Sequence, residues 1–447
     1  MPGTSPLTAG IDLGSTSIKM LVSDVAGTQV ACEQVPTPWR SGPGGTTELD
    51  ARTLRTTIDE LVAATGAALP AGTVVAAIGI AGMGETGFLV DHALNAAAPA
   101  FAWFDPRGAD EAASFSPELR AAFAGRTGLP LGAQVSLAKL AYERRRGIPL
   151  EDFRWLNIPE FAAAHLGGDV AAEYSLASRT GLLDQNTGEP WPLALAELGV
   201  GPGFLPPLRG AGSSWGAASA VRSGPFAGAA LTVAGHDHLV AAEATGSLHP
   251  GRYHVSMGTA EVILRVTDGP LSPEARGRLA DMLINEVRHI APDRHVIVAG
   301  VKSGLLLRRA LQLAGISDRA GRDQLDANVS ELPYEGALPH GALVASGARN
   351  DDGVLRLEIS SDGVSPAEIF GAVLRHSNDE IRRLLEAIER ELPPATTTTL
   401  TGGWASMSSV RRARSRVLPD LTVSSREQDT AHGAALLART LLRSNNQ

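Results

Sequence analysis

Several features are scarce or missing in this chain of 447 residues, and each scarcity excludes a class of protein. Its one cysteine, Cys32, allows no intrachain disulfide and no zinc site built from thiolates of this chain, which agrees with a reducing cytosol. No stretch approaches the ~18 apolar residues of a membrane-spanning helix, and residues 1–14 lack the pattern of a secretion signal. We therefore expect a cytoplasmic protein that does not span a membrane.

Excess positive charge is also missing. The 39 basic side chains are outnumbered by 48 acidic ones, so the net charge of −9 gives no general attraction to nucleic acid or to an anionic membrane. Glycine and proline, with 49 and 28 residues, stay far below the level of a collagen-like or low-complexity chain. At about 100–200 residues per domain, the length predicts two or three globular domains.

A strand–turn–strand pattern opens the chain and returns near its middle. Apolar residues alternate on both sides of a glycine-containing turn at residues 14–16, and residues 253–264 repeat the pattern around a second glycine. Such a repeat indicates two similar domains, each opened by a β-hairpin. We place the boundary so that residues 1–248 form the N-terminal domain and residues 249–447 form the C-terminal domain.

Predicted helices and strands alternate in both halves, which indicates an α/β fold. In the first half, Asp50 is a predicted helix N-cap, Gly66 is expected just past the end of that helix, and residues 74–80 form a buried strand. In the second half, residues 365–368 form a predicted capping box before a long amphipathic helix, and residues 396–400 form a β-branched strand.

The first turn has the groups that bind a phosphate. Backbone N–H groups of Gly14, Ser15 and Thr16 can point at one anion, the hydroxyls and Lys19 add further donors, and Asp12 can hold Mg²⁺ through water. Many hairpins carry such residues only to make the turn, so this turn alone leaves a structural role open. Its recurrence in the second half favours phosphate binding.

Two phosphate-binding turns, one from each of two similar domains, resemble the actin-like (ribonuclease H-like) ATPase fold of sugar kinases, actin and heat-shock ATPases. The chain has no G-x-x-x-x-G-K-[ST] loop, and its first turn lacks the G-x-G-x-x-G pattern of a dinucleotide site. Further segments are similar, in order and spacing, to the FGGY family of carbohydrate kinases. They are AGMGETG at 81–87 followed by Asp91, WFDPR at 103–107, EYSLASRTGL at 173–182, AGHDH at 234–238, SMGT at 256–259, GG at 402–403 and HGAA at 432–435.

This resemblance implies a cleft between the two domains and a catalytic aspartate near the end of the first. Asp237 matches that position, and we expect it to take the proton of the acceptor hydroxyl. Together with Asp12 it is our candidate ligand of Mg²⁺. Capping the helix that begins there is a compatible alternative. The neighbouring His236 and His238 do not complete a zinc site, and His238 either bonds the sugar or is structural.

The candidate sugar-binding residues lie in the first domain. Trp103 can pack on the apolar face of a sugar ring, and Asp105 and Arg107 either bond its hydroxyls or support the loop from behind. Glu85 stands where the xylulokinase branch carries a Met-His pair and the glycerol kinase branch an Arg-Glu pair, so the sequence departs from both. We expect Glu85 to bind a polyol hydroxyl, with a solvated loop position as the alternative.

The second domain is expected to bind the nucleotide. The resemblance assigns its second turn to phosphate contacts and a Gly-Gly turn to the close approach of adenine and ribose, which a Cβ would obstruct. The helix that follows carries an arginine-rich segment, 411–416, in place of the family's usual residues, and we interpret it as a solvated helix face. The candidate cofactor contacts in this domain are Gly258, Thr259, Gly300, Gly402 and Gly403.

We therefore expect a kinase that uses ATP and Mg²⁺ to phosphorylate a hydroxyl of a small sugar, ketose or polyol. Dimers are common in the family, so a homodimer is compatible with the resemblance. Two alternatives stay open, an actin-like ATPase without a sugar substrate and a catalytically silent sensor of sugar and nucleotide. The segments at 103–107 and 175–182 argue against the first, and Asp12, Asp237 and the two turns argue against the second.

Overall fold

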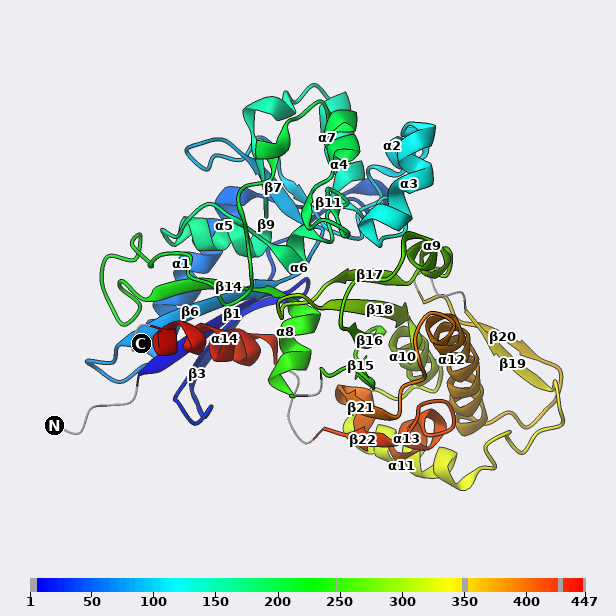
Figure 1. The fold of residues 1–447 in the computed structure, drawn as a ribbon. Helices are drawn as coiled ribbons and strands as arrows, with labels where there is room; N and C mark the ends of the chain where they lie inside the picture. The colour runs from blue at the N-terminus through cyan, green and yellow to red at the C-terminus, as the bar shows by residue number, and fades with distance from the viewer. Residues whose placement is uncertain (1–5, 247, 348–352, 425–428, 445–447) are drawn as a thin grey trace.

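Two β-sheets form the cores of two lobes (Figure 1). The computed structural model describes residues 6–246, 248–347, 353–424 and 429–444, so the first five residues of the predicted N-terminal domain lie outside it. The first sheet has the strand order β14-β6-β1-β2-β3. Its strands are β1 (Leu7–Leu13), β2 (Ser17–Ser23), β3 (Gln29–Pro36), β6 (Val75–Gly82) and β14 (Ala230–His236).

The second sheet repeats the arrangement of the first. Its order is β17-β18-β16-β15-β21-β22. Strand β15 pairs antiparallel with β16 and parallel with β21, as β1 pairs antiparallel with β2 and parallel with β6. This match confirms the predicted duplication and the α/β fold. The strands are β15 (Arg252–Met257), β16 (Glu261–Thr267), β17 (Asn285–Arg288), β18 (His295–Val301), β21 (Thr397–Thr401) and β22 (Leu421–Val423).

Helices cover both sheets. In the first lobe, α1 (Ala51–Ala67) and α5 (Ile158–His165) pack on one face and α14 (Thr430–Ser444) packs on the other (Figure 1). Helix α8 (Asp237–Ala244) follows β14 directly and leads into the second lobe. The helices of the second lobe are α9 (Pro273–Asp281), α10 (Ser303–Leu313), α11 (Arg319–Glu331), α12 (Pro366–Glu389) and α13 (Ser408–Arg414).

A further layer of short elements covers the first sheet at the top of Figure 1. Its helices are α2 (Ala109–Ser114), α3 (Pro117–Thr127), α4 (Ser136–Arg145), α6 (Tyr174–Ala177) and α7 (Pro192–Leu198). Its strands are β4 (Arg40–Ser41), β5 (Thr47–Leu49), β7 (Gly87–Val90), β8 (Ala100–Phe101), β9 (Arg154–Asn157), β10 (Ala172–Glu173), β11 (Leu183–Asp184), β12 (Glu189–Pro190) and β13 (Leu208–Arg209). In the second lobe, β19 (Leu343–Ser346) pairs with β20 (Arg356–Ile359).

Two predicted helix ends differ in detail. The side chain of Asp50 caps α1 as predicted, but Gly66 lies inside its last turn, where Pro225 and Phe226 pack closely against it. The capping box predicted for α12 is only half formed. Ser365 accepts the N–H of Glu368, whereas the Glu368 carboxylate accepts the N–H of Ala337 from a neighbouring loop.

The last helix leaves the second half of the chain and packs on the first sheet. Gly10 and Gly79 are paired in the register of β1 and β6, and a Cβ on either would overlap a backbone carbonyl of α14. A Cβ on Gly433 would likewise overlap the carbonyl of Val240 on α8. Glycine therefore sets the distance between α14 and its neighbours. The proposed domain boundary near residue 248 falls between α8 and β15 and stays a prediction.

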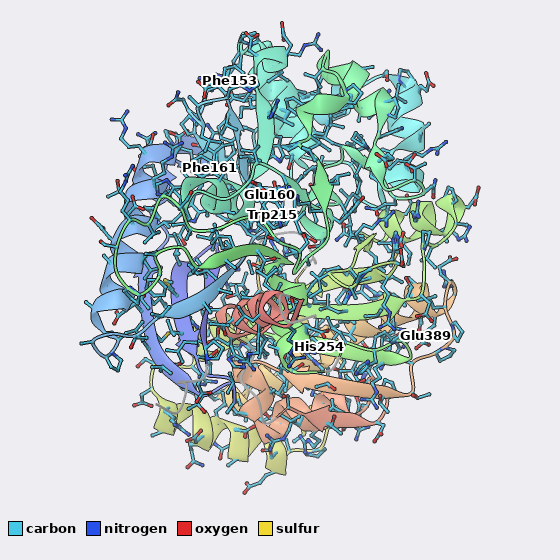
Figure 2. All side chains as sticks on the ribbon, turned by 60° about the vertical axis from the view of Figure 1, so that its left-hand side comes forward. Phe153, Glu160, Phe161, Trp215, His254 and Glu389 are labelled. Atoms are coloured by element: carbon cyan, nitrogen blue, oxygen red, sulfur yellow. The ribbon has the colours of Figure 1, made fainter. Side chains whose placement is uncertain are left out.

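A carboxyl group is enclosed in the core of the first lobe, where Figure 2 labels Glu160, Phe161 and Trp215. Glu160 accepts the backbone N–H groups of Asn157 and Glu173, at 2.7 and 2.8 Å, and so ties the start of α5 to β10. Burial raises the pKa of Glu160 to about 8. None of the helices in the described part of the chain combines the length and apolar character needed to cross a bilayer.

The contact of α14 with the first sheet can be tested by Gly79→Ala. We expect a loss of roughly 2 kcal/mol or more in the free energy of unfolding, because the added methyl must push the backbone of α14 outward. Gly201→Ala is the control, since a Cβ there meets nothing within 4 Å and the residue has a negative φ. Equal unfolding midpoints in urea for the two variants would contradict this packing.

Candidate active site

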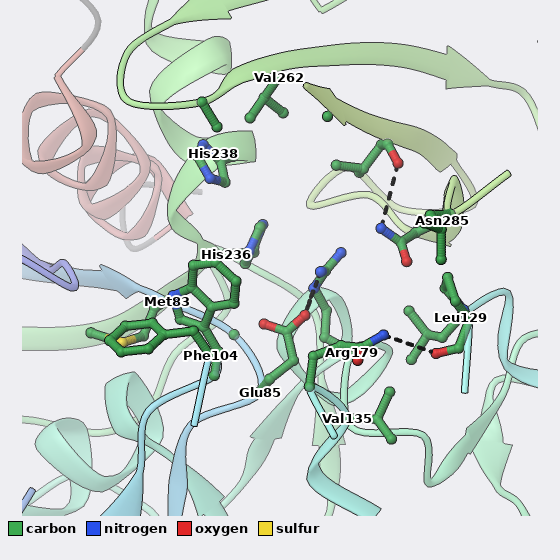
Figure 3. Close-up of a pocket in the computed structure, with 18 of the residues that line it drawn as sticks. Met83, Glu85, Phe104, Leu129, Val135, Arg179, His236, His238, Val262 and Asn285 are labelled. Atoms are coloured by element: carbon green, nitrogen blue, oxygen red, sulfur yellow. Dashed lines mark hydrogen bonds and ion pairs between the residues drawn. The ribbon is translucent and has the colours of Figure 1, made fainter. Parts of the chain in front are cut away.

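A cavity of about 640 Å³ lies between the two lobes and takes its lining from both (Figure 3). In Figure 3 Met83, Glu85 and Phe104 of the first lobe lie on one side, and Val262 and Asn285 of the second lie opposite. The predicted site residues that line it are Ser15, Glu85, Trp103, Asp105, Asp237, His238 and Gly300. The predicted residues outside its lining are Asp12, Gly14, Thr16, Lys19, Gly258, Thr259, Gly402 and Gly403.

The first turn is held from behind by its carbonyl groups. Thr37 Oγ1 donates to the carbonyl of Gly14 and Trp39 Nε1 to that of Ser15, both at 2.7 Å. Among the described residues, no group accepts a hydrogen bond from the N–H of Ser15 or Thr16. With the carbonyls fixed and these donors unused, the turn is suited to bind an anion.

The second turn joins β15 to β16 on the second lobe. Gly258 donates to the carbonyl of Ala260 at 3.0 Å, and Gly258 and Thr259 are exposed. Gly402 has φ +94°, and a Cβ on it would overlap the backbone of Met257, so the Gly-Gly turn lies directly against the end of β15. Glycine is required at position 402 for both reasons.

Carboxylates gather beside the first turn. Asp12 Oδ1 is buried and has no hydrogen-bond partner among the described residues. Burial, followed by the charges of Asp237 and Asp429, raises the pKa of Asp12 well above its usual value, although Lys19 opposes this shift. Lys19 itself pairs with Asp429 at 3.1 Å. Sequence reasoning missed Asp429, which precedes α14 and accepts the N–H of His432.

This arrangement fits a divalent cation. An unpartnered carboxylate oxygen, with two further carboxylates close enough to raise its pKa, is a donor set that Mg²⁺ favours. The described residues contain no cluster of three or more acidic, histidine or cysteine side chains that could hold a metal alone. Asp12 and Asp237 could therefore hold Mg²⁺ only together with water or phosphate oxygens.

Asp237 is the first residue of α8 and lies at the cavity. The N-cap position is occupied by His236, so Asp237 does not cap the helix, and its Oδ1 accepts the N–H of His238 at 2.6 Å. Burial raises the pKa of Asp237, but His238, His236, the N–H of His238 and Arg179 together hold it below its usual value. Burial lowers the pKa of His236 to about 3, so this imidazole is neutral at physiological pH.

A buried hydrogen-bond network fixes the backbone next to Asp237. Ser175 Oγ accepts the N–H of His236 at 3.0 Å and donates to Glu173 at 2.6 Å. Gly235 has φ +109°, and a Cβ there would lie 2.6 Å from Ser175 Oγ. The segment 173–182 therefore supports the end of β14. Its sequence alone did not reveal this role.

The aromatic wall of the cavity comes from the predicted sugar-binding segment. Trp103 and Phe104 are 40% and 47% exposed and pack edge to face, with ring centroids 5.3 Å apart. Asp105 is buried, and its carboxylate accepts hydrogen bonds from Thr47 and Arg107. These contacts favour the supporting role for Asp105 and Arg107.

Glu85 is not a solvated loop residue. It is 7% exposed, lines the cavity and forms an ion pair with Arg179. The sequence placed Arg179 within a family segment but gave it no role. The pairing joins residues that lie 94 positions apart in the sequence, so no local pattern could have revealed it.

Comparison with known proteins identifies the family of this chain. The profile of the N-terminal domain of the FGGY family of carbohydrate kinases matches residues 7–242, more than half of the chain. The chain belongs to the FGGY family of carbohydrate kinases. This membership confirms the resemblance found in the sequence.

Individual relatives lie at modest identity. A xylulose kinase of Streptomyces rubiginosus is 28% identical over 59% of this chain, and the chain spans 54% of that relative. A gluconokinase of Bacillus subtilis (strain 168) is 23% identical over 96% of this chain and 86% of the relative. The crystal structure of a ligand-bound xylulose kinase from Lactobacillus acidophilus, 16% identical, matches with a TM-score of 0.85 over 99% of this chain and 90% of that one. The predicted fold of two actin-like domains is confirmed.

The arginine-rich segment of this FGGY protein is not a solvated face, contrary to our interpretation. Arg414 is fully buried and binds both carboxylate oxygens of Glu261, at 2.8 and 2.7 Å. Glu261 is the first residue of β16, directly after the second turn, and also accepts from Ser303. Arg412 donates to three backbone carbonyl groups at the C-terminal end of α11, those of Val329, Ser330 and Leu332. Arg414 therefore anchors the second turn and Arg412 binds the end of α11, while Ser415 and Arg416 at the end of the segment are exposed.

A buried lysine supports the aromatic wall and provides a test. Lys139 donates to the carbonyls of Asp105 and Ala133, at 2.9 and 2.7 Å. Burial lowers the pKa of Lys139 to about 8, despite the opposing charges of Asp105 and Glu85. An ordinary lysine pKa is about 10.4. Between pH 8 and this value Lys139 is therefore more protonated in the unfolded chain than in the folded chain, and the free energy of unfolding rises with pH.

We therefore expect the folded state to gain roughly 1.5 kcal/mol from Lys139 as pH rises from about 8 to about 9.5. The measurement is the difference in unfolding free energy between wild type and Lys139→Met at both pH values. Subtracting the variant removes the contribution of other titrating groups. A difference that stays constant with pH would show that Lys139 keeps an ordinary pKa in the folded protein.

Proposed function

We propose that this chain transfers the γ-phosphoryl group of ATP to a hydroxyl of a small sugar, ketose or polyol, with Mg²⁺ as cofactor. The observation that carries the proposal is the position of Asp237 at the cavity between two turns, with its pKa held below the usual value. The exposed aromatic wall of Trp103 and Phe104 in the same cavity supports a sugar substrate. No observation on the described residues favours the actin-like ATPase or the silent sensor.

Both lobes would take part in binding the nucleotide. The N–H groups of Ser15 and Thr16 in the first turn, and of Thr259 next to Gly258 in the second, would bind phosphate oxygens. Gly300, Gly402 and Gly403 would let the nucleotide approach the backbone of the second lobe. Lys19, which pairs with Asp429, would donate a further hydrogen bond to the phosphates.

The first lobe would bind the acceptor and move its proton. Trp103 would pack on the sugar ring and His238 would bond a hydroxyl. Asp237 is ionised at neutral pH and would accept the proton of the attacking hydroxyl. Asp12 and Asp237 would hold Mg²⁺, which neutralises charge on the phosphate oxygens when bound. Closure of the lobes would exclude water that hydrolyses ATP.

The role of Asp237 is tested by Asp237→Asn. We expect kcat to fall by about 10²–10⁴, because the amide cannot accept the proton, while the affinity for ATP changes little. The measurements are ADP release with a sugar panel and ATP binding by calorimetry. Glu243→Gln, on the exposed side of the same helix α8, is the matched control. A kcat near that of wild type in Asp237→Asn would remove it as the base.

The role of Asp12 is tested by Asp12→Asn. We expect the Mg²⁺ concentration for half-maximal rate to rise about tenfold or more, since a neutral amide is a poorer ligand for this cation. Asp268→Asn, an exposed aspartate of the second lobe, should leave that concentration unchanged. Identical Mg²⁺ dependence in both variants would argue that Asp12 has no part in metal binding.

A further inference from the structure

Two parts of the cavity that come from distant stretches of the chain share one support. Ser15 of the first turn and Trp103 and Phe104 of the aromatic wall all line the cavity. The support is the segment 37–49, which begins after β3 and ends just before α1. Its start contacts the turn, and its end contacts the segment that carries the wall.

The start of the segment 37–49 is bonded to the first turn. Thr37 donates its N–H to the carbonyl of Thr16 at 3.1 Å and its Oγ1 to that of Gly14 at 2.7 Å. Trp39 Nε1 donates to the carbonyl of Ser15 at 2.7 Å. The carbonyl groups of three consecutive turn residues thus accept hydrogen bonds from this short stretch.

The end of the same segment is bonded to the residues around the aromatic wall. Strand β5 pairs antiparallel with β8, which lies just before Trp103. Thr47 donates its N–H to the carboxylate of Asp105 at 2.6 Å, and its carbonyl accepts the N–H of Ala102 at 3.0 Å. One continuous stretch of backbone therefore holds both the turn and the wall.

Trp39 contacts the turn and the wall directly. Besides its bond to the turn, its ring meets Phe104 edge to face, with centroids 6.5 Å apart and 64° between the planes. Phe104, labelled in Figure 3, packs in turn on Trp103. Trp39 is half-buried and lies outside the cavity lining. Its side chain therefore stands behind both groups and links them.

We propose that Trp39 is a positioning residue that fixes the distance between the first turn and the aromatic wall, and so aligns the acceptor hydroxyl with the γ-phosphoryl group. This role rests on the proposed kinase function, in which the turn binds phosphate and the wall packs on the acceptor. Transfer between two bound groups depends steeply on their alignment, and a displacement of about 1 Å can cost about 10²-fold in rate. A residue that acts on alignment alone changes kcat more than KM.

The first test is Trp39→Phe, which removes the indole N–H and keeps an aromatic ring against Phe104. ADP release is measured with ATP and Mg²⁺, using the compound that wild type phosphorylates best among D-xylulose, L-ribulose, xylitol, glycerol and D-gluconate. We expect kcat to fall about tenfold, with both KM values within about threefold of wild type. An unchanged kcat, or a loss confined to KM, overturns the inference.

The matched control is Trp191→Phe in the same lobe. Trp191 also packs on a phenylalanine, Phe123, with ring centroids 6.1 Å apart, and it lies outside the cavity lining. Its kcat should stay within about twofold of wild type, because it touches neither the turn nor the wall. ADP release by wild type with none of the compounds contradicts the proposed function itself, whereas activity that is insensitive to Trp39 contradicts only its positioning role.

A double-variant cycle separates positioning from a merely structural role. Phe104→Leu breaks the ring contact from the side of the wall and is combined with Trp39→Phe. Because one side chain carries both contacts, we expect the kcat loss of the double variant to stay within about threefold of the larger single loss. A loss near the product of the two single losses, or a Phe104→Leu variant with the kcat of wild type, overturns the link.

Urea unfolding midpoints show that each variant is folded. Should Trp39→Phe lack a cooperative transition, Trp39→Tyr takes its place in the cycle, since it also lacks the indole N–H and keeps an aromatic ring.

Discussion

The site depends on how each turn is held from behind. In the first lobe Thr37 and Trp39 hold the carbonyl groups of the turn. The N–H of Gly14 donates to the carbonyl of Ser17, and those of Ser15 and Thr16 remain available for an anion. In the second lobe a buried ion pair between Arg414 and Glu261 anchors the strand that leaves the turn. Loss of one partner of such a pair typically costs about 3–5 kcal/mol. Neutral hydrogen bonds thus hold the first turn, and a buried ion pair anchors the second.

Helix α14 and the network behind Asp237 make the first lobe a rigid support. Glycines in β1 and β6 bring α14 against the sheet, and the same helix packs on α8, which carries Asp237. On the other side Ser175 and Glu173 fix the backbone just before it. Asp237 is therefore positioned by the C-terminal helix on one side and by residues from the middle of the chain on the other. Such rigidity favours an in-line transfer that tolerates little displacement.

Local patterns predicted the fold well and the site only in part. Both hairpins follow from apolar alternation around a glycine turn, a signal contained in about a dozen residues. The interpretation of Arg414 was wrong because its partner, Glu261, lies 153 positions away and burial is not visible in a charge run. The pairing of Lys19 with Asp429, 410 positions apart, was missed for the same reason. For Asp105 the sequence left two roles open. The structure favours the supporting role, because its carboxylate accepts the backbone N–H of Thr47 from a distant part of the chain.

If the proposed function holds, both turns bind one triphosphate while Asp237 faces the acceptor. A crystal structure of the protein with Mg²⁺, a non-hydrolysable ATP analogue and a neutral polyol would test this claim most directly. We predict phosphate oxygens within hydrogen-bond distance of the N–H groups of Ser15 and Thr259, and an acceptor hydroxyl within the same distance of Asp237. A nucleotide bound outside the cavity between the lobes, or a polyol hydroxyl remote from Asp237, would contradict the account.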